Sequence, residues 1–236
     1  MTLDGRALWP VTICLVLVAG CGGQKASHTR TTTAAVTPQR QIKPARPHPH
    51  PHPVHRHRPP VGSRPQTHQL PSASTPAFRQ EMRALWRGVK HNSLSAALPA
   101  FFPEPAYLQV KAIADPAADW RSRLVGGLRL DLAAAHKLLA GSVAQSHLVG
   151  VSVPAGFAHW VTPGTCENRV GYWEVPNARV LYRLRGTLRS FGIASMISWR
   201  GIWYVVHLGA VQRSGSGGMV DDPSLGRGVS VNSGTC

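Results

Sequence analysis

Apolar residues near the middle of the chain recur with the period of a helix. Between residues 76 and 103, spacings of three and four bring one set onto a single face: Phe78, Met82, Leu85, Trp86 and Val89. This stripe predicts a helix. Asn92 or Ser93 can cap a second, shorter helix that begins near Leu94.

The following residues contain one alternating stretch and a second helical pattern. Residues 106–113 alternate well enough to predict a short strand, and Asp115-Pro116 then opens a longer helix that ends near Gly141. Beyond it the apolar period changes to two, which is the period of a strand. Strands are expected at residues 147–153, 168–175, 179–184, 188–199 and 202–211.

Arg-Gly pairs at residues 185–186 and 200–201 separate the last three of these strands. Because glycine adopts positive φ without strain, such pairs predict tight hairpins. Helices followed by an antiparallel meander indicate an α+β domain, with N-terminal helices packed on a curved antiparallel sheet. We place this domain at residues 77–211, followed by a Gly- and Ser-rich tail at residues 212–236.

Two stretches of the domain resemble the nuclear transport factor two-like superfamily. Residues 85–108, "LWRGVKHNSLSAALPAFFPEPAYL", are similar to the opening helices of that family, and residues 198–209, "SWRGIWYVVHLG", to its closing strand pair. The resemblance implies a cone of helices on a curved sheet with an internal pocket. Members include isomerases, dehydratases and accessory domains without activity, so the fold alone implies no function.

The first residues of the chain have the pattern of an export signal. Arg6 precedes an apolar run at residues 7–20, which is too short for a transmembrane helix. The run ends in "VAGC" at residues 18–21, which resembles the lipobox of bacterial lipoproteins. The resemblance implies a signal peptide at residues 1–20 and a diacylglyceryl group on Cys21, with palmitate labelling of the mature protein. The mature protein is then expected on the extracytoplasmic face of the cell membrane.

Residues 21–76 have the composition of a disordered linker. Residues 22–80 contain nine Lys or Arg, seven His and no acidic residue, with few large apolar side chains. Such a segment buries too little apolar surface to offset the entropy of ordering it. We therefore expect a disordered, basic, Pro- and His-rich linker before the folded domain.

The tract at residues 44–60, "PARPHPHPHPVHRHRPP", leaves three interpretations open. Its prolines favour polyproline II, in which only residues three apart, such as His52 and His55, share a face. Because a metal site needs converging imidazoles, and Arg56 and Arg58 repel cations, a semi-rigid spacer is favoured over a metal site. A pH-dependent polybasic tether is the third interpretation.

Charge limits the class of partner. The net charge of +16 is shared between the linker and the folded domain. This favours a solvated basic surface, or affinity for an anionic cell-wall polymer, a lipid or another envelope protein. No nucleic-acid-binding motif accompanies the charge, and the export signal argues against nucleic acid as a partner.

Few residues are candidates for chemistry. No GxSxG, HExxH, CxxC, Walker or GxGxxG motif is present, so we expect no cofactor, no metal and no catalytic residue that the sequence identifies. Trp203 lies on the side of its strand that carries His207, and Trp199 faces the same way across the hairpin, so these three are candidate pocket-lining residues. A packed sheet with a hydrogen-bonded core histidine is the other interpretation, and the one that the pattern favours. Cys166 and Cys236 remain after export into an oxidising compartment, and we expect them to form a disulfide.

These observations favour a lipid-anchored envelope protein that acts as a non-enzymatic binding or scaffolding module, held off the membrane by its spacer. The alternative is an envelope enzyme with a cone-shaped pocket, such as an isomerase, dehydratase or hydrolase. That alternative requires at least one ionisable residue buried in the pocket.

Overall fold

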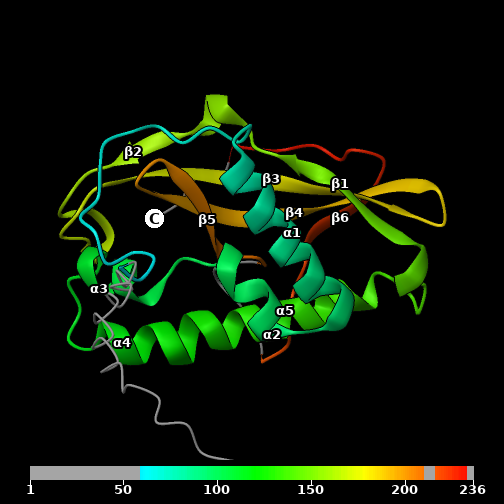
Figure 1. Cartoon of the computed structure of the whole chain (residues 1–236), viewed down its shortest axis with the longest axis horizontal. Helices are drawn as coiled ribbons and strands as arrows, with labels where there is room; N and C mark the ends of the chain where they lie inside the picture. The colour runs from blue at the N-terminus through cyan, green and yellow to red at the C-terminus, as the bar shows by residue number, and fades with distance from the viewer. Residues whose placement is uncertain (1–58, 210–215, 233–236) are drawn as a thin grey trace, which may run out of the picture. The chain divides into compact units, whose positions relative to one another are not determined.

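The computed structural model describes residues 59–209 and 216–232. The signal peptide, Cys21, the histidines of the tract at residues 44–60 and Cys236 lie outside these residues, so their interpretation stays a prediction. Within the described residues, helices come first in the chain and strands follow, as the apolar pattern predicts (Figure 1). None of the helices described is long and apolar enough to cross a membrane.

Helix α1 (Pro76–His91) confirms the predicted apolar stripe, because all five residues of the stripe are buried. The Thr75 hydroxyl caps its start by accepting from the Phe78 N–H at 3.1 Å. The helix ends where Asn92 turns to a φ of 45°. Ser93 then caps α2 (Leu94–Ala97), which leads into the 3-10 turn η1 (Leu98–Ala100).

The strand expected at residues 106–113 is wrong, because this segment belongs to helix α3 (Glu104–Val110). Proline is tolerated in the first turn of a helix, where Pro105 lies, and Glu104 complements the helix dipole there. The apolar residues also fit a helix, since Tyr107 and Val110 are buried at a spacing of three. The alternation of apolar residues over this short segment therefore predicted a strand where the chain forms a helix.

The long predicted helix is confirmed as one nearly continuous helical segment. It comprises α4 (Pro116–Asp119), the π-helical turn η2 (Trp120–Leu124) and α5 (Val125–Lys137). Asp115 caps its start by accepting from the Ala118 N–H at 2.8 Å. Three short 3-10 turns follow along the chain: η3 (Val143–Gln145), η4 (Ala155–Phe157) and η5 (Thr165–Glu167).

In the described part of the chain, six strands form one antiparallel sheet: β1 (Ser146–Ser152), β2 (His159–Val161), β3 (Tyr172–Leu184), β4 (Thr187–Trp199), β5 (Ile202–His207) and β6 (Asp221–Leu225). The order is β1-β3-β4-β5, with β2 also beside β3 and β6 also beside β4. The two strands expected at residues 168–175 and 179–184 are one long strand, β3. Both Arg-Gly turns have two successive positive φ angles, 50° and 79° at Arg185-Gly186 and 52° and 76° at Arg200-Gly201, as tight hairpins require. The predicted α+β class is confirmed.

The helices pack on one face of this sheet (Figure 1). Trp86 of α1 contacts Tyr182 of β3, with ring centroids 5.2 Å apart. Phe102, which follows η1, makes edge contacts with Trp199 and Tyr204. The core therefore lies between the helical layer and the two long strands.

The segment at residues 59–75, which we expected to belong to the linker, contacts the sheet. Gln66 donates to the Ser198 carbonyl at 2.7 Å and accepts from the Arg200 N–H at 2.7 Å. The centroid of the His68 ring lies 3.8 Å from that of Trp160, with the two rings tilted by 36°, and 5.5 Å from that of Trp173, whose ring it meets edge-on. The structured part of the chain therefore begins before residue 77, through polar and aromatic contacts that an apolar count overlooks.

The C-terminal segment is also attached to the sheet, although its composition predicts only a tail. Buried Arg179 donates to the Asp222 carboxylate and to the Ser190 hydroxyl, both at 2.7 Å. Asn177 donates to the Val231 carbonyl at 2.7 Å. Cys166 is disulfide-bonded, and its pairing with Cys236, outside the described residues, stays a prediction.

Limited proteolysis should leave a resistant fragment that begins between residues 59 and 64. In a Gln66→Ala/His68→Ala double variant the start should move toward residue 76, because the side-chain hydrogen bonds of Gln66 and the ring contacts of His68 are then lost. Mass spectrometry of the fragments measures the boundary. Gln80→Ala/His91→Ala, at two exposed positions of α1, is the matched control. A wild-type fragment beginning near Ala77 would contradict this assignment.

Candidate functional site

A small cavity of about 200 Å³ lies between α3, η2 and strands β3, β4 and β5. Most of its exposed lining surface is apolar, and several ionisable and polar side chains are set into that surface. The lining residues are Tyr107, Val110, Lys111, Arg123, Leu124, Cys166, Asn168, Tyr172, Glu174, Ser195, Ile197, Val206 and His207. The ionisable residue that the enzyme alternative requires is therefore present.

Strand register explains which residues reach this cavity. Residues paired across neighbouring strands lie on the same face of a sheet. Glu174 of β3 pairs with Ile197 of β4, and Ser195 of β4 pairs with His207 of β5. All four therefore lie on the face that the helices cover.

A bulge changes the predicted position of Trp203. The register of β4 with β5 shifts between Ser195 and Met196, which leaves Val206 as an extra residue in β5. Such a residue reverses the alternation of side chains along a strand. Trp203, paired with Ser198, therefore lies on the opposite face from His207, and the prediction of a shared wall is wrong for this residue.

His207 and Trp199 lie on one face but in different places. His207 lines the cavity, whereas Trp199 lines a separate hollow of about 580 Å³ that also contains Glu81 and Tyr204. Burial raises the pKa of Glu81 to about 8, although the hydrogen bond with the Tyr204 hydroxyl lowers it in part. The Glu81 Oε2 atom is buried without a hydrogen-bond partner among the described residues.

Tyr107, Asp119 and Arg123 form a charged network beside the cavity. Arg123 donates to both carboxylate oxygens of Asp119, at 2.7 and 2.6 Å, and to the Tyr107 hydroxyl at 3.0 Å. The Tyr107 hydroxyl donates to Asp119 at 2.5 Å. The hydrogen bond from Arg123 has the largest effect on the pKa of Asp119 and lowers it, and the hydrogen bond from Tyr107 lowers it further. Burial raises the pKa of Tyr107. Asp119 is thus held as a carboxylate that orients two donors.

Lys111 brings a partly buried ammonium group to the cavity. Its Nζ donates to the Cys166 carbonyl at 2.7 Å. Burial, followed by the charge of Arg123, lowers the pKa of Lys111. A lysine in this state has donors left for a ligand and exchanges its proton more readily than an exposed one.

The sheet supplies the opposite wall. Ser195 donates to one oxygen of Glu174 at 2.9 Å, and His159 Nε2 lies 3.9 Å from the other. Asn168 donates to the Tyr172 hydroxyl at 2.9 Å, and burial raises the pKa of Tyr172 to about 12. Asn168 Oδ1 is buried without a hydrogen-bond partner among the described residues.

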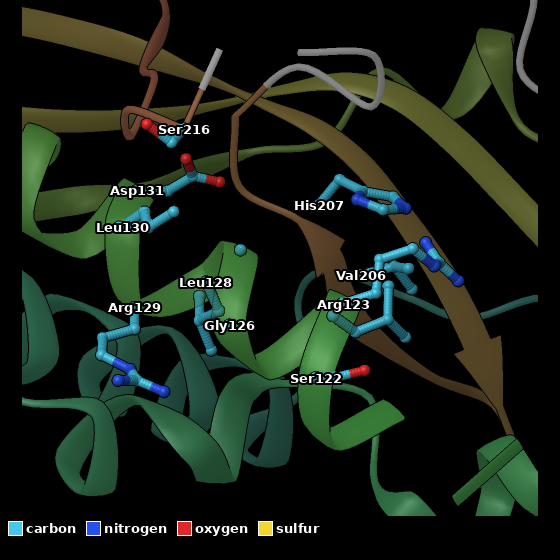
Figure 2. Close-up of a pocket in the computed structure, with 12 residues that line it drawn as sticks. Ser122, Arg123, Gly126, Leu128, Arg129, Leu130, Asp131, Val206, His207 and Ser216 are labelled. Carbon is cyan, nitrogen blue, oxygen red and sulfur yellow. The ribbon is translucent and has the colours of Figure 1, made fainter. Parts of the chain in front are cut away.

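A wider and shallower hollow of about 520 Å³ adjoins the cavity and shares Arg123, Leu124, Val206 and His207 with it. Figure 2 shows Asp131 on one side of this hollow, with Arg123 and His207 on the other. Asp131 is buried and accepts from the Gly209 and Met219 N–H groups at 2.9 Å each. It therefore fastens the chain after β5 to α5.

Sequence patterns identified only His207 among these residues. The others come from several separate elements, among them α3, η2, β3 and β4, so no local spacing connects them. Glu174, a carboxylate at an inward position of a strand, carries a weak signal, as does the i,i+4 pair of Asp119 and Arg123. Among the residues described, no group of three His, Cys, Asp or Glu side chains is arranged to hold a metal ion.

No protein-family model, curated protein or solved structure matches this chain. The resemblances to the nuclear transport factor two-like superfamily and to bacterial lipoproteins therefore stay predictions from sequence.

Proposed function

We propose that this chain is a lipid-anchored protein of the cell envelope whose folded domain binds a small polar ligand in the cavity between α3 and the sheet. One observation carries the proposal: Lys111, Arg123, Tyr172, Glu174 and His207 line a single small cavity. Convergent polar groups in a concave, partly buried site are typical of ligand binding. The lipid anchor and the spacer rest on the sequence of residues 1–58.

The composition of the wall defines the ligand chemistry. Lys111 and Arg123 supply charged donors, while Glu174 supplies a carboxylate, so the ligand carries both acceptor and donor groups. A volume of about 200 Å³ lies below the range of about 300–1,000 Å³ that is usual for pockets that bind drug-sized molecules. The ligand is therefore a small polar or zwitterionic molecule rather than a lipid chain.

Stability alone does not account for this set of residues. Burying charged groups costs several kcal/mol per ion, and well-packed apolar residues in their place are often as stable or more so. Lys111 has a lowered pKa because the folded protein disfavours its charge. Glu174 is also buried, at 4% exposure, so its charge in the wall opposes folding unless a ligand or a neighbouring donor compensates it.

Thermal denaturation with a panel of small carboxylates, amino acids and sugar phosphates tests this proposal. A ligand at a hundredfold excess over its Kd should stabilise the protein by about 2.7 kcal/mol, which corresponds to a rise in Tm of about 5 to 10 °C. Glu174→Gln should abolish most of that rise, because it removes the charge of a buried acceptor.

Glu167→Gln is the matched control, since it makes the same change at an exposed position next to Cys166. It should retain the full stabilisation. A panel without any stabilising compound, or equal effects of the two substitutions, would contradict the proposal.

An enzymatic function is the second candidate, and the lowered pKa of Lys111 favours it. A lysine that deprotonates more easily, in a cavity with Glu174 and Tyr172, suits proton transfer to or from a bound molecule. If the domain is an enzyme, NMR of the bound ligand should show its conversion. Lys111→Met should stop that conversion, whereas binding, weakened by the loss of one donor, should stay measurable.

A further inference from the structure

A second recess of about 620 Å³ lies between α1 and strand β1, away from the cavity. Helix and strand lie side by side here (Figure 1). Buried Phe78, Met82 and Trp86 form its floor. Val149 of β1, at its edge, is 54% exposed. We call this recess the α1–β1 groove.

Basic side chains follow the groove along its length. Arg79, Arg83 and Arg87 line it at intervals of four residues, followed by Lys90. Residues four apart in a helix lie on one side, about 6 Å apart along the axis. All three arginines are exposed. The groove thus presents a row of evenly spaced positive charges.

No acidic side chain of residues 59–209 or 216–232 lines the groove. Ion pairs elsewhere involve Glu104, Asp119 and Asp222, with arginines outside the groove. Glu81 is the acidic residue of α1, and it lines the hollow that contains Trp199. The positive charge of the groove is therefore not balanced within the described part of the chain.

We propose that the α1–β1 groove binds a linear phosphate-bearing polymer of the cell envelope. Guanidinium groups pair with phosphate oxygens through two parallel hydrogen bonds, and a regular row of them matches a chain with repeating charges. A recess admits a narrow polymer strand, whereas a flat bilayer would contact only its rims. This proposal is independent of the ligand in the cavity.

Fluorescence anisotropy with labelled long-chain polyphosphate tests the proposal. The protein is the full chain carrying Cys21→Ser, which removes the predicted lipid. Arg79→Gln/Arg83→Gln should weaken binding about tenfold and should reduce the steepness of the salt dependence by about 1 to 2. Both positions are exposed, so thermal melting should stay nearly unchanged.

Arg121→Gln/Arg227→Gln is the matched control, because it removes two exposed positive charges outside the groove. It should retain most of the affinity. Equal weakening by both double variants would show that net charge alone determines binding, and would overturn the proposal. Unchanged polyphosphate binding by the groove variant would also overturn the proposal, because the binding site would then lie outside the groove, for example in the basic linker.

Two further probes distinguish the class of partner. Polygalacturonate, a carboxylate polymer, should bind more weakly than polyphosphate, and tighter binding would overturn the assignment to phosphate. Phosphatidylglycerol vesicles should compete poorly with polyphosphate. The wild type could instead sediment with these vesicles without measurable binding to polyphosphate, and the groove variant could lose that sedimentation. Such a result would indicate a bilayer as the partner and would also overturn the proposal.

Discussion

Replacing Glu81 with glutamine should raise the free energy of unfolding above pH 8 and leave it nearly unchanged at pH 4. Burial raises the pKa of this carboxyl group from 4.5 to about 8. The folded state therefore holds a proton that the unfolded chain has lost, so stability falls as the pH rises from about 4.5 to about 8. At about 1.4 kcal/mol per pKa unit, the loss is at most about 5 kcal/mol.

Glutamine removes this penalty because it stays neutral, and its amide oxygen still accepts from Tyr204. Urea denaturation at several pH values measures the effect. Glu167→Gln, at an exposed carboxylate, should follow the wild-type profile. If the profile of Glu81→Gln also falls between pH 4.5 and 8 as steeply as the wild type, another group is responsible.

Replacing Cys21 with serine should move the protein completely from the membrane fraction to the soluble fraction. Serine offers no thiol for a diacylglyceryl group, and a protein held by two acyl chains loses its stable anchor without them. Fractionation of cells that express the variant, together with palmitate labelling, measures the change.

Cys14→Ser is the control, because Cys14 lies within the predicted signal peptide and departs on cleavage. This variant should stay in the membrane fraction and take up palmitate. Wild-type protein that is released without label would indicate an ordinary cleaved signal.

The sequence was informative where one physical cause dominates. The stripe of α1 and the alternation of β3 to β5 reflect burial of apolar side chains against a single core. Both hairpins follow from glycine at positive φ. These features depend on neighbouring residues, so a single sequence suffices to predict them.

Other features depend on residues far apart in the chain. The hydrogen bonds of Gln66 and the contact of the His68 ring with Trp160 help to hold the N-terminal segment, and no apolar pattern reveals them. The bulge at Val206 reverses the side of Trp203. The cavity joins residues such as Lys111 and Glu174, from separate elements, so only the tertiary fold brings them together.

The ligand site in the cavity is the central claim, and native mass spectrometry tests it most directly. Full-length protein purified from its own envelope without denaturation should contain a population heavier by one small molecule, which denaturation releases. Glu174→Gln should lack this population and Glu167→Gln should retain it. Identical native and denatured masses for the wild type, or an adduct that persists in Glu174→Gln, would contradict the claim.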